Sequence, residues 1–355
     1  MTALTVPAGP GPGREAGLRP VPWRRMAWVT WRQHRLALAG TATLLGALAA
    51  WLWLTGLQLH HAYAAATACH PASSIACIHL INSFNAMDDF LANGGILQAV
   101  PVLIGAFVGA PVLARELETG TFRYAWTQGL GRWRWTLAKL VLLAVAVTAA
   151  AEAFSVLVSW YFQPYFAAGN QNVSLSEMSP FFPGLFDLRG VAFAAWTLAA
   201  FAIGALAGML IRRVVPAIAA TLAVYAGLAF AVAGFLRQHY LTPLVTSNPN
   251  VPVSAWIMSQ WWTRGGKFAF AGWPPANILQ RFCPAGPSGP VGPGGMPKAA
   301  GIAECLAQHG GYTQWTSYHP ASQFWAFQWI EAGWLLALSV LLIAVTVWLV
   351  RRRAA

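Results

Sequence analysis

Two apolar runs separated by a pair of arginines decide the class of fold. Residues 191–236 read VAFAAWTLAAFAIGALAGMLI, then RR, then VVPAIAATLAVYAGLAFAVAGFL. A helix needs about 20 mostly apolar residues to cross a membrane, and each run has that length. Because Arg212 and Arg213 leave room only for a short turn, the stretch predicts two membrane spans joined as a hairpin.

The rest of the chain has the composition of a membrane protein. Of its 355 residues, 57% are hydrophobic and only 9% are charged, whereas a soluble domain carries roughly 25% charged residues. Small residues such as those of Gly204–Gly208 let membrane helices approach closely. We therefore predict an all-α polytopic membrane protein with six spans, at about residues 36–57, 96–114, 137–161, 191–211, 214–236 and 330–350.

The positions of lysine and arginine predict the orientation. With the N-terminus in the cytoplasm, sixteen of the 22 basic residues lie on the cytoplasmic side and six lie outside, five of them in one long loop. Cytoplasmic loops of membrane proteins carry an excess of Lys and Arg. Both termini are thus expected in the cytoplasm, and the formal charge of +12 reflects topology rather than nucleic-acid binding.

The segments outside the spans have distinct compositions. Residues 1–22, rich in Gly and Pro, predict a disordered tail, and residues 23–35 predict an amphipathic helix in the membrane interface, with Trp on one side and Arg on the other. The expected outer loops are residues 58–95, 162–190 and 237–329, and residues 351–355 form a short cytoplasmic tail. The Gly- and Pro-rich part of the long loop, residues 286–295, is interpreted as a flexible linker.

All four cysteines fall in the predicted outer loops. Cys69 and Cys77 lie in the first loop, and Cys283 and Cys305 lie in the long one. An even number of cysteines confined to one face favours disulfides in an oxidising compartment. Pairing neighbours in sequence, Cys69 with Cys77 and Cys283 with Cys305, is the simplest of three possible arrangements. The histidines near the first pair match no zinc spacing, and no metal site is predicted.

A charged segment follows the second span. It reads ARELETGTFRYAWTQ over residues 114–128. A polar cluster marks the membrane exit, Gly120 allows a bend, and Thr121 is suited to cap a following helix. The aromatic residues beyond it, beside Arg123, favour either a docking surface for another protein or an inner loop packed on itself.

This segment resembles the Glu-x-Glu-x-Gly-Thr signature of type-2 ABC exporter permeases. Glu116, Glu118, Gly120 and Thr121 match its fixed positions, while the usual Arg between the two acids is Leu117 here, with Arg115 preceding the first acid. The six spans, the internal termini and the large outer region before the last span are also similar to that family. Residues 28–35, WVTWRQHR, resemble the start of permeases common in actinobacteria, which implies a bacterial cytoplasmic membrane.

The resemblance implies a partner and a mechanism. Such a permease works as a dimer, with a second copy or a sister chain, and exports its substrate when a separate ATPase subunit closes beneath it. Residues 115, 116, 118, 120, 121 and 123 would form the loop that couples to the ATPase. The chain has no Gly-x-x-x-x-Gly-Lys-Ser/Thr loop, so ATP and magnesium are expected on the partner alone. The substrate is expected to be amphipathic or lipid-like.

Two other classes of function stay open at this point. Glu152 is the one acid well inside a predicted span, and a carboxylate in lipid is costly unless it serves a pathway, a proton site or a partner. A proton-coupled carrier could use Glu152, although no inverted repeat is evident. A membrane-embedded enzyme would need acids or histidines converging at one depth, and no catalytic motif is present.

Overall fold

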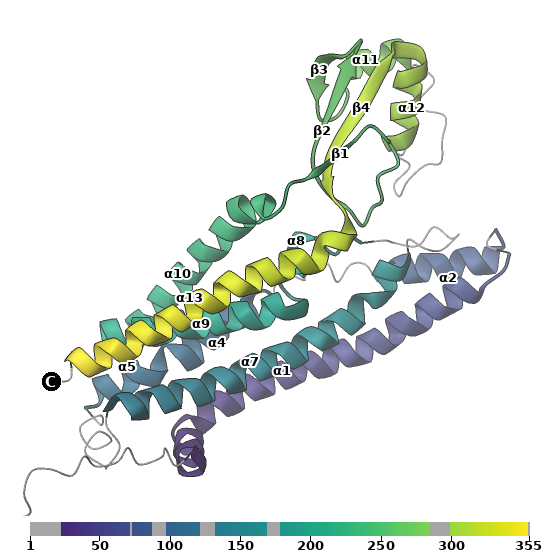
Figure 1. Cartoon of the computed structure of the whole chain (residues 1–355). Coiled ribbons are helices and arrows are strands. Elements are labelled where there is room, and N and C mark those ends of the chain that lie inside the picture. The colour runs from purple at the N-terminus through teal and green to yellow at the C-terminus, as the bar shows by residue number, and fades with distance from the viewer. Residues whose placement is uncertain are drawn as a thin grey trace, which may run out of the picture.

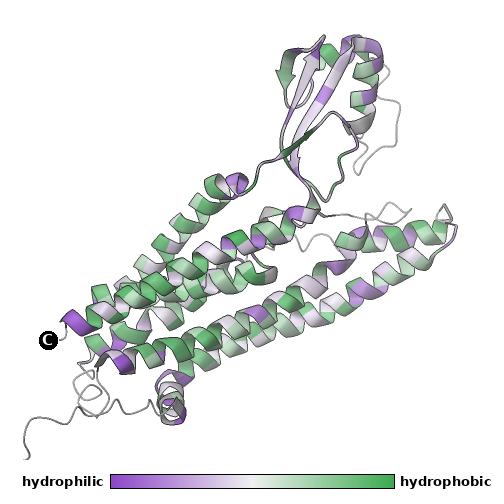
Figure 2. Cartoon of the chain, in the orientation of Figure 1, coloured by the Kyte–Doolittle hydropathy of each residue, from purple (hydrophilic) through white to green (hydrophobic). Residues whose placement is uncertain are grey.

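The computed structural model describes residues 23–71, 73–86, 97–120, 132–168, 178–283 and 299–353. Six of its helical segments are long and apolar enough to cross a membrane. These segments are Ala27–Ala68, Ala99–Glu118, Trp133–Ala167, Gly190–Ile211, Val214–His239 and Ala321–Arg352. They run side by side as a bundle whose helices are mostly apolar along their length (Figures 1 and 2). The number and order of these segments agree with the six predicted spans, and most segments extend beyond their predicted ends.

Helix α1 shows the largest extension. It runs without a break through Trp23–Ala68, which is 46 residues, whereas an interfacial segment, a span and part of a loop were predicted there. Its first turns are set at an angle to the rest of the helix (Figure 1). The predicted tail, residues 1–22, lies outside the described residues. Helix α7, Arg132–Ala168, packs along α1. Together with α2, Ile75–Asn85, these two helices extend beyond the other spans at the end of the bundle opposite the C-terminus (Figure 1).

The second span is irregular at its centre. Helix α4, Ala99–Ile104, passes into the π-helical turn η3, Gly105–Gly109, and then into α5, Pro111–Glu118. Single π-helical turns often mark functional positions within α-helices. Here the turn lies against helix α9, Gly190–Ile211, which is the most buried span of the bundle.

Small residues allow these two spans to touch backbone to backbone. A Cβ atom added at Gly204 would collide with the carbonyl oxygen of Gly105, and one added at Gly208 would collide with that of Ala110. Close approach of this kind is typical of small-residue interfaces between membrane helices. Helix α9 also packs against α7, against α10, Val214–Ala231, and against α13, Phe324–Arg353, and so forms the centre of the bundle.

The long loop between the fifth and sixth spans contains a folded α/β insert. Four antiparallel strands form a sheet in the order β1-β4-β2-β3. Its strands are β1, Leu244–Thr246; β2, Trp256–Arg264; β3, Lys267–Ala271; and β4, Tyr312–His319. The bundle is all-α as predicted, but this sheet was not predicted. The proposed linker, residues 286–295, lies outside the described residues.

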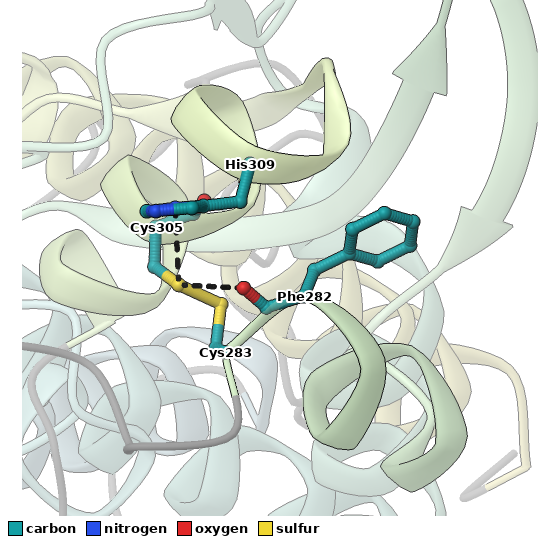
Figure 3. Close-up of a disulfide and its surroundings, with 4 residues drawn as sticks. All are labelled: Phe282, Cys283, Cys305 and His309. Carbon is teal, nitrogen blue, oxygen red and sulfur yellow. Dashed lines mark hydrogen bonds between the residues drawn. A yellow bond between two sulfur atoms is a disulfide. The ribbon is translucent and has the colours of Figure 1, made fainter.

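Two helices cover one face of this sheet. Helices α11, Ala276–Phe282, and α12, Ala299–Gly310, enclose a small apolar core that includes Trp262, Leu306 and Tyr312. The disulfide Cys283–Cys305 joins the end of α11 to α12, as Figure 3 shows. A small domain with a limited core gains much of its stability from such a cross-link. The insert stands at the end of the bundle opposite the C-terminus (Figure 1).

The remaining elements are short. They are α8, Pro183–Phe186; η4, Val232–Leu236; η5, Arg237–His239; and η7, Ala321–Gln323. A second disulfide, Cys69–Cys77, closes the turn between α1 and α2. The structure thus has both disulfides of the sequence-local pairing.

Candidate functional site

The charged segment after the second span ends helix α5, and residues 116–120, where the helix stops, are called the elbow here. The Thr119 hydroxyl donates to the Arg115 carbonyl oxygen at 2.8 Å, and the Thr119 amide donates to the same oxygen at 3.0 Å. Gly120 then takes a φ of +70°, a left-handed conformation that glycine adopts without steric cost and that commonly ends a helix. Helix α5 therefore stops directly after the second acid of the signature.

Glu116 connects this elbow to the third span. Its Oε1 accepts a hydrogen bond from the Lys139 ammonium at 2.6 Å, and the same ammonium donates to the Val112 carbonyl oxygen at 3.0 Å. The Lys139 side chain has no exposed surface, whereas that of Glu116 is 15% exposed. A buried charge needs such a partner because removing it from water is costly. The pair therefore holds α5 against α7.

Glu118 connects the elbow to the hairpin of the fourth and fifth spans. Its Oε2 accepts a hydrogen bond from the backbone N–H of Val214 at 3.0 Å, the first residue of α10. The first N–H groups of a helix have no partner within the helix, and the positive end of its dipole favours a carboxylate. Arg212, with a φ of +61°, ends α9 just before it. The two acids of the signature therefore contact different neighbouring spans.

Leu117 occupies the position where the family signature has an arginine, and the structure shows what this side chain contacts. Its side chain is partly buried and packs against the main apolar core of the bundle, whereas Arg115 is exposed. On α5 the two acids are two positions apart, so the residue between them points in a third direction. An apolar side chain there adds packing instead of another charge.

Of the other predicted site residues, the structure describes Glu152, which is not at the elbow. Thr121 and Arg123 lie outside the described residues. Glu152, in the middle of α7, is partly buried and has neither an ion pair nor a hydrogen bond with any residue that the structure describes. Within the same residues, no group of three or more His, Cys, Asp or Glu side chains is placed to hold a metal ion.

A second buried charge cluster lies where the α/β insert joins the bundle, and the sequence analysis missed it. Arg237 donates from Nε to Glu331 Oε2 at 2.9 Å and from Nη2 to Glu331 Oε1 at 2.7 Å. It also pairs with Asp187. Glu331 is fully buried and also accepts a hydrogen bond from the Trp196 indole at 2.8 Å. The cluster therefore joins α9, η5 and α13.

The charges in this cluster do not balance, since one guanidinium faces two carboxylates. Burial raises the pKa of Asp187 to about 7; the positive charge of Arg237 opposes this shift, and the negative charge of Glu331 adds to it. Protonation of Asp187 near neutral pH would leave one cation and one anion. The bidentate Arg237–Glu331 contact is the geometry that arginine makes with carboxylates at buried sites.

The only sequence signal for this cluster was the acid near the start of the sixth predicted span. Glu331 is the second residue of the predicted range 330–350, where it looked like an ordinary boundary residue, and Arg237 was counted with the outer loop. No local pattern joins residues 94 positions apart. Their contact depends on α9, against which both α10 and α13 pack.

Comparison with known proteins gives the family. Residues 42–237, which are more than half of the chain, match the family model described as ABC-2 membrane transporter related. No curated protein and no solved structure was found to match the chain. The matched region begins within α1 and ends at Arg237, so it includes the elbow with both of its acids. The chain therefore belongs to the ABC-2 membrane transporter related family and is a membrane-spanning permease of the ABC transporter type.

Proposed function

We propose that this chain is the permease subunit of an ATP-driven exporter and that a separate ATPase subunit acts on it at the elbow after the second span. In this proposal the elbow and both termini face the cytoplasm of a bacterial cell, and the α/β insert faces outward. Two permease chains, identical or related, enclose the substrate path. The expected cargo is amphipathic or lipid-like.

The observation that carries this proposal is the pair of contacts made by the signature acids. Glu116 joins α5 to α7 through Lys139, and Glu118 joins α5 to the first turn of α10. A displacement applied at residues 116–120 would therefore move the second, third and fifth spans together. Coupling between two sites requires such an element, shared by both and able to take two arrangements.

The exposed apolar faces of two spans are available to a second permease chain. Within the chain, α1 and α10 are the least buried of the six span segments. On α10, Val215 is 77% exposed and Phe230 is 71% exposed. Lipid or a second permease chain must cover these surfaces, because they are too apolar to face water.

Co-purification with the partner tests the proposal. The full chain is co-expressed with a candidate ABC ATPase from the same genome, extracted in mild detergent and captured by a tag on the permease. Wild-type permease should retain the ATPase, and Glu118→Lys should lose most of it. The introduced cation would face the positive end of α10 and the two arginines before it, Arg212 and Arg213, and would disrupt the elbow. Glu304→Lys, which reverses the charge of an exposed acid in the α/β insert, is the matched control and should retain it.

A backbone variant tests coupling separately from attachment. Proline fixes φ near −65°, so Gly120→Pro cannot keep the elbow's φ of +70°. We expect the complex to assemble but to hydrolyse ATP without moving substrate. Normal transport by both Gly120→Pro and Glu118→Lys would contradict the assigned role of the elbow.

The side of the membrane is testable with a single introduced thiol. All four native cysteines are in disulfides, and Thr119 is exposed. A Thr119→Cys chain in intact cells should resist a membrane-impermeant maleimide until the cells are opened. Labelling from outside intact cells would place the elbow on the wrong face for contact with an ATPase.

A further inference from the structure

A groove between the first and second spans has a cationic end and an apolar end. The cationic end is a cleft of about 530 Å³ between the start of α1 and helix α5. The apolar end is a second cavity of about 270 Å³, lined by α1, α4 and η3. Leu36, Ala37 and Phe107 line both cavities, so the two form one continuous groove along the bundle.

The charge at the cationic end is not compensated within the described part of the chain. Arg32, Arg35 and Arg115 line the cleft, and none of them forms an ion pair with any residue in the described ranges. The one carboxylate in the lining, Glu116, is already paired with Lys139 at 2.6 Å. Three guanidinium groups thus face the cleft without a counter-ion from the described part of the chain, and guanidinium groups bind phosphate oxygens readily.

A further polar atom of the lining lacks a partner. The Nδ1 atom of His34, which lines the same cleft, is buried and has no hydrogen-bond partner among the described residues. The exposed Trp28 and Trp31 lie one turn before Arg32 and Arg35 on α1, and Trp is enriched where a membrane meets water. The cationic end is therefore at the depth of lipid headgroups.

The apolar end continues along the spans and has no charged residue in its lining. Leu44, Leu45, Val100, Leu103 and Ile104 line it together with Gly40. A Cβ atom added at Gly40 would meet nothing within 4 Å, so this side of the groove is open. An apolar channel leading away from a cluster of guanidinium groups is complementary to one kind of molecule, an amphiphile with an anionic head.

We propose that the groove between α1 and α4–α5 binds a single phospholipid with an anionic headgroup, its phosphate at Arg32, Arg35 and Arg115 and an acyl chain along Gly40 and Leu44. The bound lipid would join the start of α1 to the elbow. Lipid binding at this site does not require the partner ATPase, so it can be tested separately from the proposed export function.

Native mass spectrometry of the purified full chain in detergent tests the proposal. Three probes are titrated: phosphatidylglycerol, phosphatidylcholine with the same acyl chains, and glycerol 3-phosphate, which has the phosphate without the chains. We expect phosphatidylglycerol to bind about tenfold more tightly than phosphatidylcholine, because each basic side chain near the membrane surface favours anionic lipid. Glycerol 3-phosphate should bind far more weakly than either, because it buries no apolar surface.

Two variants with matched controls locate the site. Arg32→Gln with Arg35→Gln should weaken phosphatidylglycerol binding about tenfold; the control, Arg351→Gln with Arg352→Gln, removes the same charge at the end of α13 and should leave it unchanged. Gly40→Leu fills the apolar end and should reduce the binding of both lipids. Its control, Gly46→Leu, adds the same side chain on the same helix, also into open space but outside the groove lining.

Several results would overturn this inference. Equal binding of the two lipids would remove the headgroup argument, and equal binding of glycerol 3-phosphate and phosphatidylglycerol would reduce the site to one for free anions. Variants of either end that bind like their matched controls, while eluting as folded protein in gel filtration, would place the lipid elsewhere.

Discussion

The contact between Glu116 and Lys139 supports a quantitative prediction about unfolding. Replacing Glu116 with Gln leaves the Lys139 ammonium, which has no exposed surface, without its carboxylate. Removing one partner of a buried ion pair costs about 3–5 kcal/mol. The lower end of that range applies here because the Glu116 side is 15% exposed and water reaches part of the contact. We therefore expect Glu116→Gln to lower the free energy of unfolding by about 3 kcal/mol.

Replacing the other partner of the pair, Lys139, should lower the free energy of unfolding by less. Lys139→Met replaces the ammonium with an unbranched apolar side chain of similar length, which suits a buried position. Glu116 then loses its partner but keeps some contact with water, so the expected cost is about 1–2 kcal/mol. In the double variant no buried charge is left, and the expected cost is about 1 kcal/mol. The double variant should thus be more stable than Glu116→Gln alone, with a coupling energy of about 3–4 kcal/mol.

Unfolding in mixed micelles with increasing SDS, followed by tryptophan fluorescence, measures these differences. The four proteins of the cycle are compared at one pH and one detergent concentration. Glu304→Gln is the control, because Glu304 is exposed and its one described side-chain contact is with Gln308, one helical turn away. It should lie within about 0.5 kcal/mol of the wild type.

The reasoning would fail if the costs of the two single substitutions added up in the double variant. It would also fail if Glu116→Gln matched the exposed control. Either result would mean that the signature acid contacts the third span without stabilising its position, and the elbow would lose one of its two connections.

Three more predictions concern other parts of the fold. The folded-state pKa of Asp187 is near 7 and lies above its ordinary value of 3.8, so thermal stability should fall as pH rises from about 4 to 7. Glu331→Gln removes the second carboxylate and should make this fall smaller in thermal melts from pH 5 to 8. An unchanged dependence on pH would contradict the role given to Asp187. Gly204→Val should prevent close packing of the second and fourth spans and cost at least about 3 kcal/mol, seen as loss of folded protein in gel filtration, with Gly227→Val, where a Cβ meets open space, as the control. Cys283→Ser should open the α/β insert to limited proteolysis while the bundle stays intact, because the disulfide closes only that domain; a protease pattern like that of the wild type would show that the small core is sufficient alone.

The sequence by itself determined the features that depend on local composition. A membrane span is recognised from the length of one apolar run, so all six were predictable, including the hairpin at Arg212 and Arg213. The elbow could be placed for the same reason, since its acids directly follow a span. Four cysteines also have few possible pairings, and the structure contains the simplest one.

The α/β insert could not be predicted by the same reasoning. Strand β4 begins almost 50 residues after β2 ends in the chain, yet the two strands pair directly. The Pro- and Gly-rich stretch between them, residues 286–295, predicts a flexible linker and carries no signal for paired strands on either side. The sheet forms because β2 and β4 meet in space and bury Trp262 and Tyr312 under two helices.

Only the tertiary structure decided which charges meet. Glu116 lies 23 residues from Lys139, Glu118 lies 96 residues from Val214, and Arg237 lies 94 residues from Glu331. A charged residue at the end of an apolar run looks the same in sequence whether it faces water or a buried partner. The outcome depends on the packing of separate helices, because a charge leaves water only where another element brings an opposite charge to it.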